Sequence, residues 1–123
     1  MARVRGIRGA TTADGNTKGA ILEATTELLE RLIEANNIDI DDVAAAIFTT
    51  TEDLSAEFPA QAARHLGWEH IALMNVHEMK VQDALPQCIR VLILVNTEKA
   101  PQDLANAYLK GAANLRARGM GGI

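Results

Sequence analysis

Three arginines, Arg8, Arg64 and Arg90, and one glutamate, Glu78, lie where a charge needs a partner. Arg90 lies in the apolar stretch CIRVLILVN (88–96), Glu78 ends a stretch whose same-face neighbours are apolar, and Arg8 shares a strand face with valine and glycine. An arginine keeps its charge in proteins, and leaving it buried without a partner costs several kcal/mol. These side chains therefore require opposite charges, supplied either by the protein or by a ligand.

The simplest partner for Arg90 is another residue of the same protein. The pattern alone favours a buried pair of Arg90 with Glu78, placed at a subunit interface. One glutamate cannot neutralise three arginines, however, and Arg8 and Arg64 remain. Arginine binds planar carboxylates through two parallel hydrogen bonds. The excess positive charge therefore indicates a carboxylate ligand.

The motifs of most catalytic and cofactor sites are missing. Ser55 is the only serine and has no G-x-S-x-G around it, and the three histidines lack zinc-like spacing. The stretch DIDDV (39–43) lacks the glycine and the closing glutamate of a calcium loop. The terminal GMGG follows no strand and precedes no helix, unlike a dinucleotide-binding loop. We expect no metal and no cofactor.

Composition indicates a single folded domain that binds a small anion. The chain has 123 residues, 48% of them hydrophobic, and a net charge of −4, which argues against nucleic acid or a membrane surface as a partner. Eight arginines against four lysines suit a small anionic ligand. A single cysteine, Cys88, predicts a reducing compartment and inert packing. With no signal or membrane-spanning segment, we expect a cytoplasmic protein.

The elements that must position these charges alternate between strands and helices. A strand is expected at 2–10, and Thr17 caps an amphipathic helix of about 18 residues. Further strands are predicted at 43–50, 70–79 and 88–96, with a short helix at 59–66. Phe58, Gln61 and Arg64 recur on one side of that short helix. After Pro101 the composition is helical but the periodicity is weak. The order predicts an α+β or mixed α/β sheet with one long helix on a face.

Four separated segments resemble one family. They are VRGIRGATT (4–12), TEDLSAEFPAQAAR (51–64), CIRVLI (88–93) and PQDLANAYL (101–109), and they are similar to the monofunctional chorismate mutases of the trimeric α/β class. The resemblance implies an α+β fold with a mixed sheet, one long and one short helix. It also implies a homotrimeric pseudo-α/β-barrel with active sites at the subunit interfaces. We expect one domain at 1–116 and a flexible tail at 117–123.

The resemblance also assigns the end of the chain and a reaction. A helical turn follows Pro101, and then a strand contains Tyr108. The reaction implied is the Claisen rearrangement of chorismate to prephenate, in aromatic amino acid biosynthesis, without metal, cofactor, nucleophile or proton transfer. Such catalysis rests on positioning and electrostatics.

Individual residues take their implied roles from the same resemblance. Arg90 matches the cation that stabilises the ether oxygen of the breaking bond, and Glu78 matches the carboxylate that binds the ring hydroxyl. Arg8 and Tyr108 match the residues that hold the side-chain carboxylate, and Arg64 lies near the ring carboxylate. The expected substrate-binding residues are Arg8, Tyr108, Phe58, Ala60, Gln61, Arg64, Met74, Asn75 and Leu115.

Three positions depart from the family pattern. Gln61 replaces a lysine of some members, and Asn75 replaces a cysteine that lines the pocket. After Leu115 and Arg116, the stretch ARGMGGI (117–123) replaces the usual continuation of the closing tail. We expect Gln61 to weaken binding more than chemistry, and the altered tail to raise KM before it lowers kcat. The backbone N–H of Asn75 can still bind the ring hydroxyl, although its side chain differs.

Two other functions fit parts of the pattern. An imine deaminase of similar trimeric architecture also binds a carboxylate through an arginine, but it leaves Glu78 and Tyr108 without a purpose. A trimeric regulator could sense an anionic metabolite, but it would gain little from a glutamate beside its anion site. The pair of Arg90 with Glu78 therefore discriminates in favour of the mutase.

Overall fold

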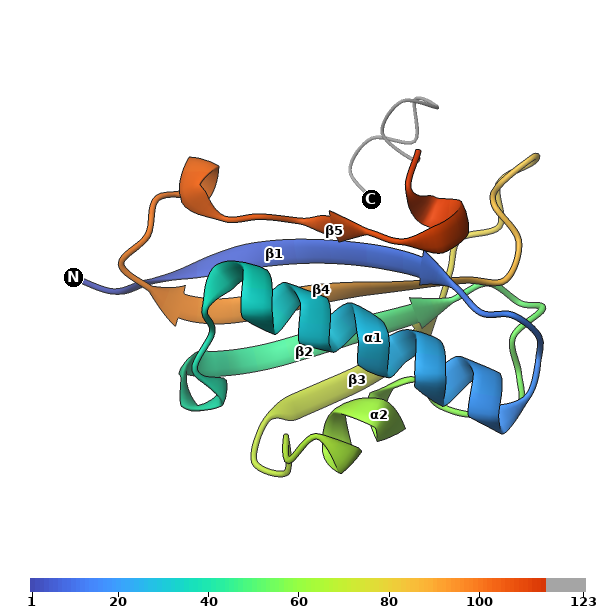
Figure 1. The fold of residues 1–123 in the computed structure, drawn as a ribbon, viewed down its shortest axis with the longest axis horizontal. Coiled ribbons are helices and arrows are strands. Elements are labelled where there is room, and N and C mark those ends of the chain that lie inside the picture. The colour runs from blue at the N-terminus through green and yellow to red at the C-terminus, as the bar shows by residue number, and fades with distance from the viewer. Residues whose placement is uncertain (115–123) are drawn as a thin grey trace.

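The structure is a computed structural model that describes residues 1–114. These residues form one mixed sheet with two α-helices on one face (Figure 1). The strands run in the order β3-β2-β4-β1-β5. Their bounds are β1 Arg3–Thr12, β2 Val43–Thr50, β3 Ala72–His77, β4 Cys88–Thr97 and β5 Ala107–Tyr108, with the helices α1 Lys18–Asn36 and α2 Ala60–His65. The described residues also contain three 3₁₀ turns: η1 Ile40–Asp42, η2 Pro101–Asp103 and η3 Lys110–Ala112.

Strand β4 lies at the centre and is antiparallel to both of its neighbours, β1 and β2. The outer strands β3 and β5 run parallel to β2 and β1 respectively. The sheet is therefore mixed, and with one long and one short helix it confirms the predicted α+β class.

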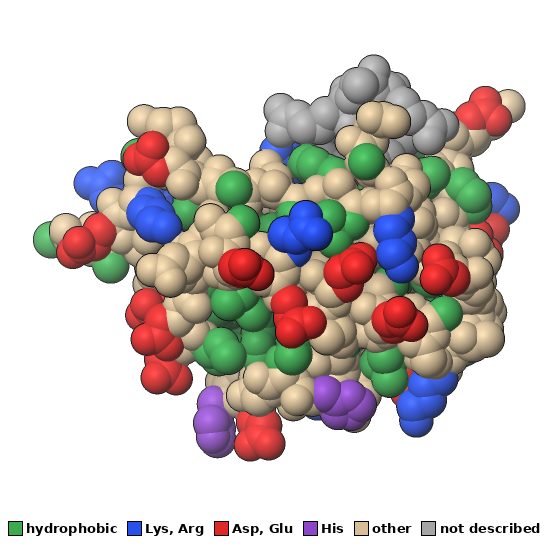
Figure 2. Space-filling model, viewed as in Figure 1, with side chains coloured by type: hydrophobic (Ala, Val, Ile, Leu, Met, Phe, Trp, Pro, Cys, Tyr) green, Lys and Arg blue, Asp and Glu red, His purple; other side chains and the backbone are tan. Residues whose placement is uncertain are grey.

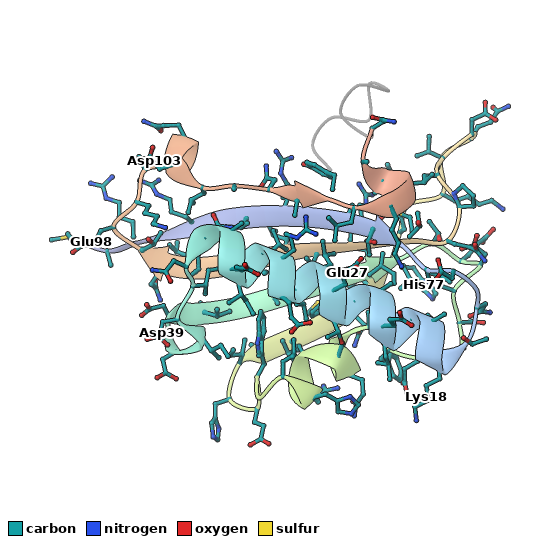
Figure 3. The ribbon with its side chains drawn as sticks, in the orientation of Figure 1. Lys18, Glu27, Asp39, His77, Glu98 and Asp103 are labelled. Atoms are coloured by element: carbon teal, nitrogen blue, oxygen red, sulfur yellow. The ribbon has the colours of Figure 1, made fainter. Side chains whose placement is uncertain are left out.

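The long helix α1 forms where the apolar spacing predicts it. The Thr17 hydroxyl accepts a hydrogen bond from the Ala20 N–H at 3.1 Å, and Asn37 ends the helix in the left-handed conformation, with φ of 50°. Leu28 and Leu32 are fully buried against the sheet. The outer side carries acidic residues, and Glu27 points away from the strands (Figures 2 and 3).

Burial alternates along β4 and separates the two faces of the sheet. Ile89, Val91 and Ile93 are buried on the side that packs on the helices. Arg90 and Leu92 are half-buried on the opposite side. Within residues 1–114, no helix covers that opposite side, which we name the open face. It also exposes large apolar side chains: Val4 at 55%, Met74 at 57% and Val76 at 39%.

The end of the described chain follows the family expectation rather than its own helical composition. Residues 101–114 contain two 3₁₀ turns and the short strand β5, and no α-helix. Because the apolar residues there do not repeat at helical spacing, an α-helix would have no continuous face to bury, whereas the edge of β1 offers backbone partners. The predicted strand at 70–79 is shorter, since β3 covers only Ala72–His77.

Membrane-spanning segments are not found in this part of the chain. Within residues 1–114, no helix combines the length and the hydropathy needed to cross a bilayer.

Candidate active site

An ion pair between Arg90 and Glu78 lies on the open face. Glu78 directly follows β3, and its N–H donates to the carbonyl of Thr50 at 2.9 Å. Its Oε1 accepts from Arg90 Nε at 2.7 Å, and its Oε2 pairs with Arg90 Nη2. The side chain of Arg90 is 22% exposed, and that of Glu78 is 13% exposed. The predicted pairing of Arg90 with Glu78 is present, and it is bidentate. Its position at a subunit interface stays a prediction.

Thr49 completes this arrangement, and sequence reasoning missed it. Its hydroxyl donates to Glu78 Oε1 at 2.5 Å, and its strand position is directly opposite Arg90. The same carboxylate oxygen therefore accepts from both side chains. The sequence contained a signal for this residue, because Thr49 lies two positions after Ile47 in the apolar run and so shares a strand face with it, where a hydroxyl stands out among apolar side chains.

Tyr108 lies in the same transverse row of the sheet. Ala10 of β1 is the register partner of Arg90 on one side and of Tyr108 on the other. Burial lowers the pKa of the Arg90 guanidinium below its ordinary value, and the electrostatic effect of Tyr108 raises the same pKa. Arg90 stays charged at neutral pH, and Tyr108 is within electrostatic range of it.

Arg8 joins the same site from β1. It lies two residues before Ala10, on the open face, and its backbone N–H donates to Asn106 Oδ1 at 2.9 Å. A cleft of about 270 Å³ lies on this face. Its lining residues are Arg8, Gly9, Ile47, Thr49, Glu78, Arg90, Val91 and Leu92. Two arginines beside one carboxylate leave net positive charge there, which suits an anionic ligand.

A second group of predicted residues lies on α2 and the edge strand β3. Phe58 is 65% exposed, and Ala60, the first residue of α2, is fully buried. Arg64 Nη1 donates to Gln61 Oε1 at 3.1 Å, so these two side chains pair with each other. None of them lines the cleft that contains Arg90.

Asn75 and Met74 complete this second group on β3. The side chain of Asn75 points toward α2, where its Oδ1 accepts from the Ala60 N–H at 3.0 Å. Asn75 and Phe58 both line a separate pocket of about 310 Å³. Met74 projects from the open face. Leu115 and Arg116 lie outside the described residues.

The two groups occupy different parts of one chain. Arg8, Glu78, Arg90 and Tyr108 lie on the open face, on β1, β4 and β5 and directly after β3. Phe58, Gln61 and Arg64 lie on α2 or next to it, outside the cleft that contains Arg90. The chain therefore brings together the charged half of the predicted site and holds the short-helix half apart from it.

The fold and the cleft define a class: a small α+β protein with a mixed sheet, helices on one face and a cleft lined by two arginines and a glutamate on the other. Comparison with known proteins identifies the family within this class. The model of the family "Chorismate mutase type I" matches residues 4–118. The chain belongs to the chorismate mutase type I family.

Individual relatives agree over nearly the whole chain. It is similar to "Chorismate mutase AroH" of Thermus thermophilus, with 46% identity over 92% of this chain and 93% of the relative. It is also similar to the protein of the same name in Bacillus subtilis, with 40% identity over 92% of this chain and 90% of the relative. A solved chorismate mutase from Clostridium thermocellum superposes with a TM-score of 0.86 at 46% identity, covering 88% and 96% of the two chains.

Proposed function

We propose that the protein is an isomerase that rearranges chorismate to prephenate, in the biosynthesis of aromatic amino acids. The observation that carries the proposal is the half-buried Arg90–Glu78 pair in the cleft on the open face, within a chain of this family. A binding protein for a carboxylate gains little from Glu78, since a negative charge beside the site repels the ligand.

In the proposed mechanism, Arg90 stabilises charge that exists only in the transition state. As the carbon–oxygen bond breaks, the ether oxygen gains negative charge, and a fixed cation lowers the energy of that state more than that of the substrate. The ion pair engages Nε and Nη2 of a guanidinium that has five N–H donors, so Nη1 lies outside the pair. Glu78 holds Arg90 in place and binds the ring hydroxyl.

Binding selects the folded conformer of the substrate. Chorismate is a flexible dianion, and fixing its two carboxylates in a chair-like shape removes the entropy cost from the chemical step. Arg8 and Tyr108 hold the side-chain carboxylate beside Arg90. Arg64 holds the ring carboxylate, with Phe58 as an apolar wall.

A complete site of this kind requires a second copy of the chain, because no residue of the α2 group lines the Arg90 cleft within one chain. We propose a homotrimer with sites at the subunit interfaces. The exposed Val4, Met74 and Val76 of the open face support this, since exposed apolar patches mark association surfaces. Sedimentation equilibrium tests it: a mass near 13.2 kDa at micromolar concentration contradicts the trimer. A free buried cysteine supports a cytoplasmic location.

The decisive experiment follows the loss of chorismate absorbance and compares Arg90→Ala with a matched control, Arg31→Ala, on the exposed side of α1. Because alanine cannot stabilise the developing anion, we expect kcat/KM to fall about 10³-fold or more, ~4 kcal/mol, with the control unchanged. Near-full activity of Arg90→Ala contradicts the mechanism. A chorismate-dependent rise in melting temperature without turnover would identify a binding protein instead.

A further inference from the structure

A buried asparagine at the end of α1 holds the segment that leads into β5. Asn36 is 4% exposed, and its Nδ2 donates to the carbonyl oxygens of Leu32 and Ala105, both at 2.9 Å. Its Oδ1 accepts from the Ala105 N–H at 2.7 Å. Both donors and the acceptor of the side-chain amide are therefore used.

The contact with Ala105 has the form of strand pairing. A residue in an antiparallel ladder exchanges both N–H···O bonds with one partner, and the Asn36 amide does the same with the backbone N–H and carbonyl of Ala105. A helix side chain thus substitutes for a neighbouring strand. Two hydrogen bonds to one residue fix its position and its orientation.

Strand β5 needs such support because it is very short. Only Ala107 and Tyr108 pair with β1, opposite Gly9 and Ala10. On the far side, the Leu109 N–H donates to the carbonyl of Ala10 at 2.9 Å. Before the strand, the contact between Asn36 and Ala105 holds the backbone, three residues ahead of Tyr108.

The same segment reaches Arg8. Asn106 follows Ala105, and its side-chain Oδ1 accepts a hydrogen bond from the backbone N–H of Arg8 at 2.9 Å. A change at Asn36 would therefore displace the backbone that carries Tyr108 and the contact that β1 makes beside Arg8. Both residues face the cleft side of the sheet.

We propose that Asn36 is a positioning residue for substrate binding: it holds Ala105, and through β5 it fixes Tyr108 over the anion site. This inference rests on the proposed function of Tyr108 as a ligand of the side-chain carboxylate. Aspartate cannot replace Asn36, because a carboxylate has no N–H to donate and would face the carbonyls of Leu32 and Ala105. Alanine leaves those backbone groups without this partner.

The test measures KM and kcat for chorismate in Asn36→Ala and Asn36→Asp, with Asn37→Gly as the matched control. Asn37 is the exposed neighbour with φ of 50°, a conformation that glycine adopts without cost. We expect KM to rise about 10-fold in both Asn36 variants, with kcat within about 2-fold, because binding is lost rather than transition-state stabilisation. The control should match wild type. A fall in kcat with unchanged KM overturns the inference.

A double-mutant cycle separates positioning from general stability. If Asn36 acts through Tyr108, the effect of Asn36→Ala on KM shrinks to about 2-fold or less in a Tyr108→Phe background. An equal effect in both backgrounds overturns the role of Asn36. A Tyr108→Phe variant with unchanged KM instead overturns the proposed role of Tyr108, so the two failures are distinguishable.

Hydrogen exchange keeps the proposal testable if the Asn36 variants do not fold. In the wild-type protein, the amide hydrogen of Ala105 is bonded to a buried side chain, so we expect it to exchange at least about 10²-fold more slowly than an unprotected amide. Unprotected exchange at Ala105 contradicts a stable hydrogen bond from its N–H to Asn36 and overturns the inference, whether or not the protein turns over chorismate.

Discussion

Arg90 and Glu78 form an ion pair on the open face of the sheet, with Arg90 Nε 2.7 Å from Glu78 Oε1. The two residues come from different elements, since Arg90 lies in β4 and Glu78 follows β3. Strand β2 lies between them and supplies Thr49, which binds the same carboxylate. The orientation of the Arg90 guanidinium thus depends on β4, on β2 and on the residue that follows β3.

Thr49→Val should lower kcat/KM about 10-fold, because Glu78 would lose the hydrogen bond from the Thr49 hydroxyl. Hydrogen bonds to charged groups contribute about 1.5–3 kcal/mol. Steady-state kinetics with chorismate measure this. Thr11→Val is the matched control: Thr11 is fully buried, and its hydroxyl has no partner within residues 1–114. That change should leave kinetics intact and raise the melting temperature. Equal kinetic losses in both variants would contradict the role of Thr49.

Gly9→Ala should destabilise the protein, because a Cβ there would lie 2.7 Å from Leu32 Cδ1 and 3.0 Å from Leu28 Cδ1. Overpacking of this kind typically costs about 1–3 kcal/mol, and urea unfolding measures it. Gly19→Ala on α1 is the control, since its Cβ would meet nothing within 4 Å. It should stabilise by about 0.5–1 kcal/mol through helix propensity. A neutral Gly9→Ala variant would refute the close packing of α1 on β1.

Asn75→Ala should lower the free energy of unfolding by about 1 kcal/mol, because the first N–H of α2 loses its side-chain acceptor. Asn75→Asp keeps an oxygen that can accept the same bond from Ala60 and should retain the stability. Chemical denaturation of both variants tests this. If aspartate is as harmful as alanine, the contact with Ala60 does not stabilise α2.

Stability should decrease at alkaline pH because of Cys88. Burial raises the pKa of its thiol from 9.0 to about 11, with a smaller contribution from Asp53. Below pH 9 the thiol is protonated in both states and contributes nothing to the pH dependence. Between pH 9 and 11 the unfolded thiol ionises while the folded one stays protonated, so the free energy of unfolding falls as pH rises, by about 2 kcal/mol near pH 10.5.

The comparison of wild type with Cys88→Ala isolates this effect from other alkaline titrations. We expect the free energy of unfolding of the wild type to fall by that amount more than that of Cys88→Ala between pH 8 and pH 10.5. The difference between the two proteins should therefore change by about 2 kcal/mol over this range. A constant difference between the two proteins would show that the thiol titrates equally in both states. The neutral thiol should also react slowly with disulfide reagents at pH 8.

Much of the fold follows from local pattern. The apolar stripe between Thr17 and Asn37 produces α1, and the continuous apolar runs produce β2 and β4, because periodicity reports directly which side of an element is buried. The end of the chain does not follow in this way. Strand β5 has two residues and depends on partners in β1 and on Asn36, which lie about 70 or more residues away in sequence.

The sequence by itself determined the residue types, and these were sufficient to predict that Arg90 needs an anion and that Glu78 is a suitable one. Only the tertiary structure decided how that requirement is met, by bringing Thr49 to the same carboxylate, turning Asn75 toward α2 and separating α2 from the cleft. The physical reason is that periodicity reports the face on which a side chain lies. Its hydrogen-bond partners depend on which strands become neighbours, and distant parts of the chain decide that together.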